Sequence, residues 1–526
     1  MSLKLKDIEW DTTDGHSGDY SKVANNGRNL DKMKTLLDST GCGFCLAKFK
    51  QVTLHLGTGM THSCHHPSPH KIPLEELKDN PAALFNTKHL KQARKEMLNN
   101  EKPSECDYCW RVEDSGGKSD RFYKSIEPWA IPDHDTVSEL KGDEDLYPSY
   151  LEVSFGNVCN MKCTYCAPEF SSKWVEELKQ YGPLKVLEGT EDEQWVQGYQ
   201  KNIDNLSIPN REFNPYIDAF WKWFPEASKH LKHYRITGGE PLMSKETVKS
   251  MQWLIDNPNP NLEFSLNSNF SIPDSLWDPF VKRLEYMATN NSVKKITIYT
   301  SVEGWGKRAE YARTGLDFNL FKQRTEQLAA MNNIRVVVMA TFNMFSITSF
   351  DKVLSWIYDL KMKHNPCNFA AGLLEKTGFN VAPDKDYPKR KADNPSHSVT
   401  VGIDIPYLRH PEMLDVHFCT HELAEDYLFK LLEFMTSRYK NESWTHPGGF
   451  EHYEIEKMKR IVVHRMYYNE KNKPDRENGN DVIRNRAKFY DFVNELDKRR
   501  DTNFLDTFPE MREFYEVCKA SKERYV

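Results

Sequence analysis

The stretch Tyr150-Leu-Glu-Val-Ser-Phe155, followed by Cys159-Asn-Met-Lys-Cys163-Thr-Tyr-Cys166, decides the fold of this chain. The first six residues are typical of a short strand. The three cysteines follow at C-x3-C-x2-C spacing, in a loop without a fourth cysteine or a histidine. Structural zinc takes four ligands in a closed tetrahedron, whereas three thiolates can hold three corners of a four-iron cluster. The spacing therefore favours an iron–sulfur cluster with one open iron over a structural zinc ion.

Short apolar segments alternate with helical patterns from residue 150 onward. The expected strands cover residues 150–155, 233–237, 262–266, 295–302, 334–341 and 399–405. Such alternation predicts a parallel sheet with right-handed crossovers. Residues 411–526 are charged and aromatic, with a helical pattern. We therefore expect an α/β fold followed by a C-terminal helical region.

The motif Gly238-Gly239-Glu240-Pro241 follows the second expected strand. Glycine suits this position because a backbone without Cβ permits close approach of a ligand. Together with the three-cysteine loop, this motif resembles the radical S-adenosylmethionine (SAM) superfamily. The resemblance covers residues 150–410 and implies a partial (β/α)6 barrel. It also implies that Cys159, Cys163 and Cys166 hold a [4Fe–4S] cluster to which SAM binds.

The same resemblance implies which residues contact SAM. The backbone of Gly238 and Gly239 and the carboxylate of Glu240 would hold the amino group of the methionine moiety. Tyr165 matches the aromatic residue that precedes the third cysteine in the family. Arg313 resembles an arginine that pairs with the methionine carboxylate, a task that suits a guanidinium fork. Four further polar residues lie at the ends of the third and fourth expected strands: Asn267, Asn269, Ser301 and Glu303.

The segment from Gly41 to Trp110 holds five further cysteines. Alternating apolar residues at 52–56, followed by Gly57-Thr58-Gly59, predict a hairpin that leads to Cys64. Thr87 is expected to cap a helix that precedes the last two cysteines of this segment. This layout resembles the twitch module, a relative of the SPASM module, which carries an auxiliary cluster.

The module resemblance covers residues 42–113 and implies a ligand set for a second [4Fe–4S] cluster. That set is Cys45, Cys64, Cys106 and Cys109, with Cys42 as a possible replacement for Cys45. Zinc is the alternative, because two C-x2-C pairs can close a tetrahedral site. His65 and His66 follow Cys64 and could also bind a metal.

The resemblance implies a radical SAM enzyme that cleaves SAM reductively to a 5′-deoxyadenosyl radical and abstracts hydrogen from a substrate. Relatives with an auxiliary module often modify peptides or proteins, so a peptide or protein is the expected substrate. An amino-acid derivative or a sugar is the alternative substrate class, and a noncatalytic metal-binding or electron-transfer protein is the alternative function. An electron donor such as flavodoxin or ferredoxin is implied. Catalytic residues are not identified: Cys419 is interpreted as buried packing, and donation of a hydrogen atom to a substrate radical is its alternative role.

Composition limits the remaining function classes. The 526 residues include 71 basic and 77 acidic side chains, a formal charge of -6, which gives no support to nonspecific nucleic-acid or membrane-surface binding. No apolar run reaches the ~18–20 residues of a membrane helix. The first twenty residues contain no segment typical of a secretory signal, and eleven cysteines, an odd number, argue against a disulfide scaffold. We expect a cytoplasmic enzyme without membrane or nucleic-acid partners.

These patterns also suggest a division of the chain. Residues 1–30 are expected to be a polar tail, and residues 31–125 the auxiliary-cluster module. Residues 145–410 are expected to form the barrel, and residues 411–526 the C-terminal helical region. The Asp-, Gly- and Lys-rich stretch 114–145 is expected to be a linker.

Overall fold

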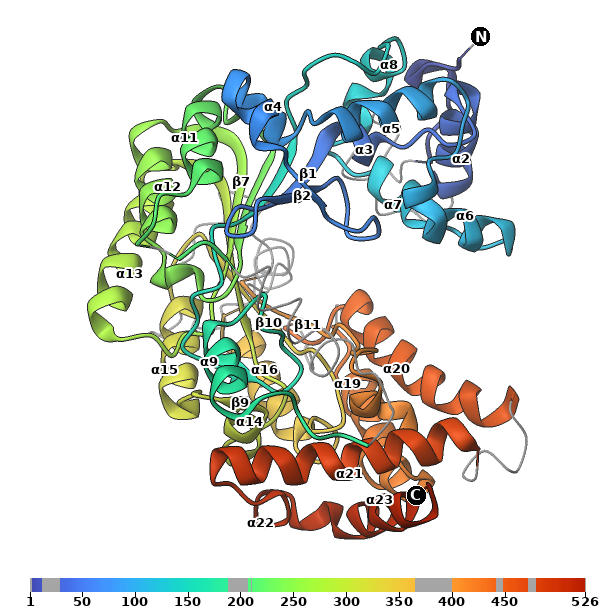
Figure 1. Cartoon of the computed structure of the whole chain (residues 1–526), viewed down its shortest axis with the longest axis vertical. Coiled ribbons are helices and arrows are strands. Elements are labelled where there is room, and N and C mark those ends of the chain that lie inside the picture. Colours follow the sequence, from blue (N-terminus) through green and yellow to red (C-terminus); the bar gives the residue numbers. More distant parts are fainter. Residues whose placement is uncertain are drawn as a thin grey trace, which may run out of the picture. The chain divides into compact units, whose positions relative to one another are not determined.

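A computed structural model describes residues 2–11, 29–187, 207–209, 211–364, 400–440, 448–471 and 479–525, with the backbone alone for 467–471. Most of the expected polar tail, at 12–28, lies outside these residues. The chain divides into two compact units, whose elements are labelled in Figure 1. The first unit comprises Met1–Gly156, Ser207–Pro241 and Asn257–Ser265, and the second comprises Asn157–Leu206, Leu242–Asp256 and Leu266–Val526.

The first unit contains a sheet with the strand order β7-β6-β4-β1-β2-β3. Its strands are β1 (Gln51–His55), β2 (Met60–His62), β3 (His70–Lys71), β4 (Tyr150–Ser154), β6 (His233–Thr237) and β7 (Asn259–Asn267). Strand β4 pairs in parallel with both β6 and β1, whereas β2 and β3 continue antiparallel. The expected strands and the hairpin are confirmed. The pairing of the hairpin with β4 joins residues that lie far apart in the sequence, so no local pattern predicted it.

The helices of the first unit are α2 (Asn29–Thr40), α3 (Leu46–Lys50), α4 (Leu74–Asp79), α5 (Lys88–Leu98), α6 (Asp107–Asp114), α7 (Asp120–Ser125), α8 (His134–Val137) and α11 (Pro215–Ala227). Several of them share an apolar core that extends to the N-terminal segment. Thr87 caps α5 by accepting a hydrogen bond from the Leu90 amide, as expected. Leu3, Leu5 and Trp10 pack against the core that α2, α3, α7 and α8 share.

The prediction of a linker at 114–145 is wrong, because this stretch forms α7 and α8. Its apolar residues Phe122, Trp129 and Ile131 are buried in the same core as α2 and α3. Burying each such side chain stabilises the fold by about 1.5–3 kcal/mol. The polar residues at both ends of the stretch dominate its composition and conceal these core positions.

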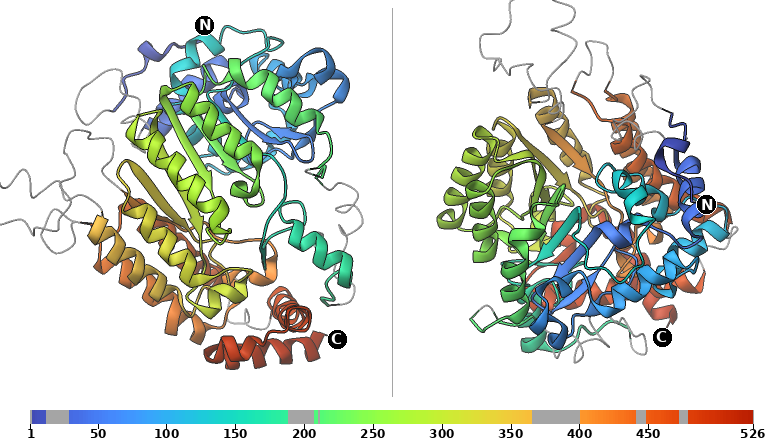
Figure 2. Two further views of the ribbon diagram at one scale, coloured as in Figure 1. Left: turned by 90° about the vertical axis from the view of Figure 1, so that its left-hand side faces the viewer. Right: turned by 90° about the horizontal axis from the view of Figure 1, so that it is seen from above.

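The second unit contains three parallel strands in the order β8-β10-β11, namely β8 (Val293–Ser301), β10 (Ile334–Met339) and β11 (Val401–Asp404). Helices α13 (Asp274–Thr289), α15 (Phe318–Ala329) and α16 (Phe350–His364) pack against β8, β10 and β11 respectively, as Figure 2 shows. The expected strands are confirmed here too. The chain is therefore mixed α/β with mostly parallel strands.

A short second sheet and further helices complete the second unit. The sheet pairs β5 (Lys162–Cys163) antiparallel with β9 (Arg313–Thr314). The other helices are α9 (Ser172–Tyr181), α12 (Lys245–Asp256), α14 (Lys307–Ala312), α18 (His421–Leu423), α19 (Phe429–Ser437), α20 (His452–Lys471), α21 (Asn480–Arg500), α22 (Phe504–Thr507) and α23 (Arg512–Tyr525). The C-terminal region is thus helical, as predicted. No described helix is both long and apolar enough to cross a membrane.

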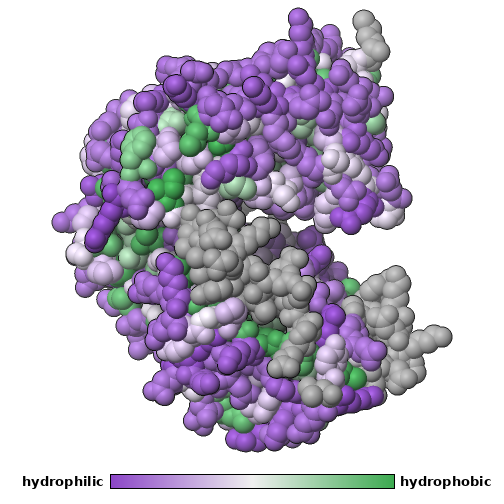
Figure 3. Space-filling model, in the orientation of Figure 1, coloured by the Kyte–Doolittle hydropathy of each residue, from purple (hydrophilic) through white to green (hydrophobic). Residues whose placement is uncertain are grey.

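The surface drawn in Figure 3 is mostly hydrophilic, with small apolar areas between polar residues. Large exposed apolar side chains such as Phe213, Leu74 and Val463 belong to different elements. Single exposed apolar residues are normal on soluble folds.

Candidate metal centres

The three-cysteine loop of the second unit is fixed by backbone hydrogen bonds. Cys163 lies on β5 opposite Arg313 of β9, and the Thr164 amide donates to the Ala312 carbonyl over 2.8 Å. The indole of Trp174 on α9 donates to the Cys163 carbonyl over 2.8 Å. The Cys166 amide donates to the same carbonyl over 3.0 Å and closes a tight turn. The backbone of the three-cysteine loop therefore has a defined conformation.

The thiols of this loop influence one another. Burial raises the pKa of Cys166, and the neighbouring thiolates of Cys163 and Cys159 raise it further. Cys163 is buried, and Nη1 of the Arg313 guanidinium donates to its sulfur over 3.6 Å. Buried thiolates that repel each other are stabilised by a bound metal. The donor set therefore fits a thiolate-bound cluster.

Three of the expected SAM-contacting residues form one buried network in the second unit. Arg313 donates to Glu303 through Nε (2.6 Å) and Nη2 (2.8 Å), and the Tyr165 hydroxyl donates to Glu303 over 2.7 Å. Burial alone would lower the pKa of Arg313, but Glu303, Tyr165 and Cys163 together outweigh burial and hold it well above its usual range. Both charged side chains are almost fully buried. The Arg313 guanidinium is therefore paired with a carboxylate of the protein itself, that of Glu303.

Asn269 and Asn267 lie near the end of β7, and Ser301 ends β8. The Asn269 side chain donates to the Asn160 side-chain oxygen over 2.7 Å, and Asn160 itself lies between the first two cysteines of the loop. Asn267 contacts the Met339 sulfur at 3.9 Å, and Ser301 pairs with Met339 in the sheet. Of these three residues, Asn269 has a direct contact with the three-cysteine loop.

The glycine motif lies directly after β6 in the first unit. Gly238 has a φ of 125°, which side chains of L-residues rarely adopt. A Cβ at this position would meet the Ser154 hydroxyl at 2.7 Å and the Gly156 carbonyl oxygen at 2.9 Å. The Gly239 amide donates to the same carbonyl over 3.2 Å, and Glu240 is buried. Glycine at 238 is therefore required by the backbone of this turn.

Four cysteines of the first unit line one pocket of about 400 Å³, measured with its open mouth. They are Cys45, Cys64, Cys106 and Cys109. Cys45 precedes α3, Cys64 follows β2, and the other two lie at the beginning of α6. The first turn of a helix favours a negative charge such as a thiolate. The structure thus brings together the four residues that the module resemblance implied.

Burial raises the pKa of Cys64 and Cys106 to about 12, and that of Cys109 to about 11. Thiols with such pKa values stay protonated at neutral pH, so a metal ion must displace their protons to bind. Cys42 does not line the pocket, and its thiol donates to the Asn100 carbonyl over 3.2 Å. The geometry fits a thiolate-bound metal and favours Cys45 over Cys42.

Lys48 is a pocket residue that the sequence reasoning missed. Its side chain is 2% exposed and pairs with Glu105. Burial alone would lower the pKa of Lys48, but the Glu105 carboxylate and Cys106, when its thiol is ionised as it would be on a metal, together outweigh burial and raise it. The only signal in the sequence was its position three residues after Cys45. A buried cation therefore lies next to the four thiols.

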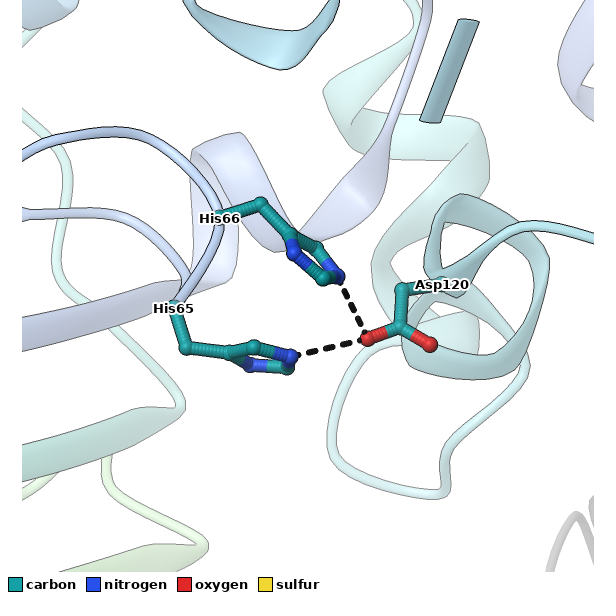
Figure 4. A group of neighbouring side chains, drawn as sticks. All are labelled: His65, His66 and Asp120. Carbon is teal, nitrogen blue, oxygen red and sulfur yellow. Dashed lines mark hydrogen bonds and ion pairs between the residues drawn. The ribbon is translucent and has the colours of Figure 1, made fainter. Parts of the chain in front are cut away.

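His65 and His66 converge on the carboxylate of Asp120 beside this pocket, as Figure 4 shows. The two Nε2 atoms lie 3.0 and 2.8 Å from the same Asp120 oxygen. Hydrogen bonds from both rings hold the pKa of Asp120 well below its usual range. His66 also stacks on Tyr108, with ring centroids 3.8 Å apart, and lines the pocket. Both imidazoles therefore have a carboxylate partner next to the thiols.

Cys419 is fully buried in the second unit. The buried Arg465 donates to its sulfur over 3.3 Å and to its carbonyl over 2.8 Å. These contacts suit the packing interpretation of this cysteine better than a role as hydrogen-atom donor.

Comparison with known proteins gives two weak similarities. No protein-family model matches the chain. The chain is 25% identical over 210 residues to a GTP 3′,8-cyclase of Vibrio atlanticus, which covers 40% of this chain and 51% of that relative. It is 27% identical over 109 residues to a GTP 3′,8-cyclase of Psychromonas ingrahamii, which covers 21% of this chain and 22% of that relative. The chain thus spans about half the length of the first curated relative and less of the second.

Proposed function

We propose that this chain is a radical SAM enzyme in which Cys159, Cys163 and Cys166 hold a [4Fe–4S] cluster that binds SAM. The observation that carries the proposal is that Cys163 and Cys159 lie near enough to Cys166 to raise its pKa, in one loop beside Arg313. The weak similarity to two GTP 3′,8-cyclases agrees with this class. The strands expected from the sequence, from β4 to β11, are those we assign to a partial (β/α)6 barrel.

The cluster and SAM would supply the reductive cleavage that generates a 5′-deoxyadenosyl radical for hydrogen abstraction. The chain's own residues hold and shape the site. The paired strands β5 and β9 and the Trp174 indole fix the loop backbone. The buried Tyr165–Glu303–Arg313 network holds a cation beside the Cys163 sulfur. A cation at this position stabilises thiolates, and its charge is partly balanced by Glu303.

We further propose that Cys45, Cys64, Cys106 and Cys109 hold a second [4Fe–4S] cluster. Their shared pocket supports this assignment, and zinc on the same thiols is the competing one. A peptide or protein is the substrate class we propose, which rests on the resemblance of the auxiliary module. A flavodoxin or ferredoxin is the proposed class of electron donor.

Production of 5′-deoxyadenosine tests the enzyme assignment. The full chain is reconstituted anaerobically with iron and sulfide, reduced with dithionite and mixed with SAM. We expect 5′-deoxyadenosine from the native protein and none from Cys163→Ala. The matched control is Cys518→Ala, which removes a buried cysteine on α23 and should retain the activity. A native protein that binds iron but does not cleave SAM would favour the noncatalytic electron-transfer alternative.

A further inference from the structure

A third group of metal-ligating side chains lies in the second unit. The group consists of Asp415, His417 and His464, whose donor atoms all lie within 4.8 Å of one another. One oxygen of Asp415 is 2.7 Å from Nδ1 of His417, and the other is 3.8 Å from Nε2 of His464. All three are more than half buried, and His464 is the most exposed, at 32% of its side chain. Two imidazoles and a carboxylate therefore face a common point.

The backbone holds the first two residues in place. Asp415 precedes the 3-10 helix η9 (Val416–Phe418) and accepts a hydrogen bond from the His417 amide over 3.0 Å. This contact fixes the Asp415 side chain at the beginning of the helical turn. The His417 ring extends from the same turn, so both side chains are positioned by one element.

The third residue comes from α20, which packs against η9. His464 is followed by Arg465, which donates to the Cys419 sulfur over 3.3 Å and to the Cys419 carbonyl over 2.8 Å. Cys419 comes directly after η9. The Arg465–Cys419 contact thus joins α20 to the turn that carries Asp415 and His417. Cys419 therefore helps to position His464 beside these two residues.

Tyr407 offers a fourth donor group, its hydroxyl oxygen, at the same point. Its hydroxyl donates to Asp415 over 3.0 Å and also contacts Nε2 of His464. The backbone at 406–408 bonds to Phe342 beyond the end of β10, through Phe342 N to Pro406 O (2.8 Å) and Leu408 N to Phe342 O (3.0 Å). The group therefore lies by the carboxyl ends of β10 and β11, the edge at which parallel α/β sheets and barrels bind ligands.

We propose that Asp415, His417 and His464 bind a divalent transition-metal ion of the zinc class, with Tyr407 as a further oxygen ligand. Imidazole and carboxylate donors suit zinc, whereas magnesium and calcium prefer oxygen donors alone. The ion would replace the direct Asp415–His417 and Asp415–His464 contacts. This site contains no cysteine ligand and is separate from both thiolate sites. The competing explanation is an Asp–His ion-pair network without a metal.

Zinc content tests the proposal in the full-length chain. The native protein and its variants are equilibrated with Zn²⁺, desalted and analysed for zinc and iron by mass spectrometry. We expect His417→Asn and His464→Asn each to contain about one zinc ion fewer than the native chain. Zinc on cysteines contributes equally to all samples, so the difference isolates this site. The matched control is His421→Asn, an exposed histidine paired with Glu425, which should keep the native zinc content.

X-ray absorption at the zinc edge keeps the test decisive if a variant at His417 or His464 fails to fold. It is recorded on the chain with His65→Asn and His66→Asn, so that the group at Asp120 supplies no imidazole, and this chain should still show zinc with imidazole nitrogen and oxygen neighbours. A shell of sulfur neighbours alone would overturn the proposal, since zinc would then occupy only the cysteines. Equal zinc content in the native chain and in a folded His417→Asn variant would overturn it too, and would leave the three residues as an ion-pair network.

Discussion

The two cysteine sites of this protein differ in how they are built. The three-cysteine loop gathers its thiols within eight residues, on a backbone pinned by β5, β9 and Trp174. The auxiliary pocket draws one thiol from a turn, one from the end of a hairpin and two from the beginning of α6. The first site therefore depends on local structure, and the second depends on the packing of the whole first unit.

The two sites also differ in the number of thiols and in the cation beside them. Three thiols leave one iron of a four-iron cluster open, whereas four thiols close the coordination. Arg313 beside the first site is paired with Glu303, which is wholly buried. Lys48 beside the second is paired with Glu105, which is partly exposed. The first site thus suits an exchangeable ligand, and the second suits a closed metal centre.

Removing the auxiliary thiols should have the largest effect, and it tests whether the two sites act independently. Cys106→Ala combined with Cys109→Ala should lower the iron content by up to about four per chain, if the pocket holds one four-iron cluster. SAM cleavage with dithionite should persist, because the three-cysteine loop is unchanged. Metal analysis and the 5′-deoxyadenosine assay on the same preparation measure both quantities.

The matched control for this double variant is Cys42→Ala, because Cys42 does not line the pocket. It should retain the native iron content. Unchanged iron with one zinc ion fewer in the folded double variant would identify a zinc site instead. Loss of 5′-deoxyadenosine in a folded double variant that keeps the first cluster would contradict the independence of the two sites.

The same contrast explains what the sequence could predict. The spacing of Cys159, Cys163 and Cys166 is local, and so are the strand patterns, which the structure confirms within a few residues. The Arg313–Glu303 pair and the Lys48–Glu105 pair depend on tertiary packing. No short-range pattern in the sequence predicts such packing. The helices within 114–145 were missed because a few buried aromatic residues stand among many polar ones. In each case the feature depends on which residues pack together in the folded chain, and the sequence alone does not show this.

The buried ion pairs give the second prediction. Arg313→Met leaves the Glu303 carboxylate buried without its cation, which should cost about 3–5 kcal/mol of unfolding free energy. The comparison is Arg121→Met in the first unit, where Glu113 is also buried but the second partner, Asp38, is 32% exposed and can be hydrated. We expect a smaller loss there. Denaturant unfolding followed by circular dichroism measures both.

A double variant checks the cause of this difference. Glu303→Gln in addition to Arg313→Met removes the uncompensated charge, so it should recover part of the lost stability. No recovery would show that the loss comes from packing of the Arg313 side chain. A larger loss for Arg121→Met than for Arg313→Met would reverse the proposed contrast between the two sites.

The smallest expected effect concerns the cation beside the auxiliary thiols. A positive charge near an iron–sulfur cluster stabilises the more negative, reduced state, and the effect is strong where water is excluded. Lys48 is 2% exposed, so Lys48→Met should shift the reduction potential of the auxiliary cluster to a more negative value. Lys50→Met is the matched control on the same helix, because Lys50 pairs with Asp133 and does not line the pocket. A potentiometric titration followed by electron paramagnetic resonance should show two couples in the native protein, of which Lys48→Met moves one. Equal shifts in both variants would mean that only the net charge matters, and a single couple would show that the pocket holds no redox-active metal.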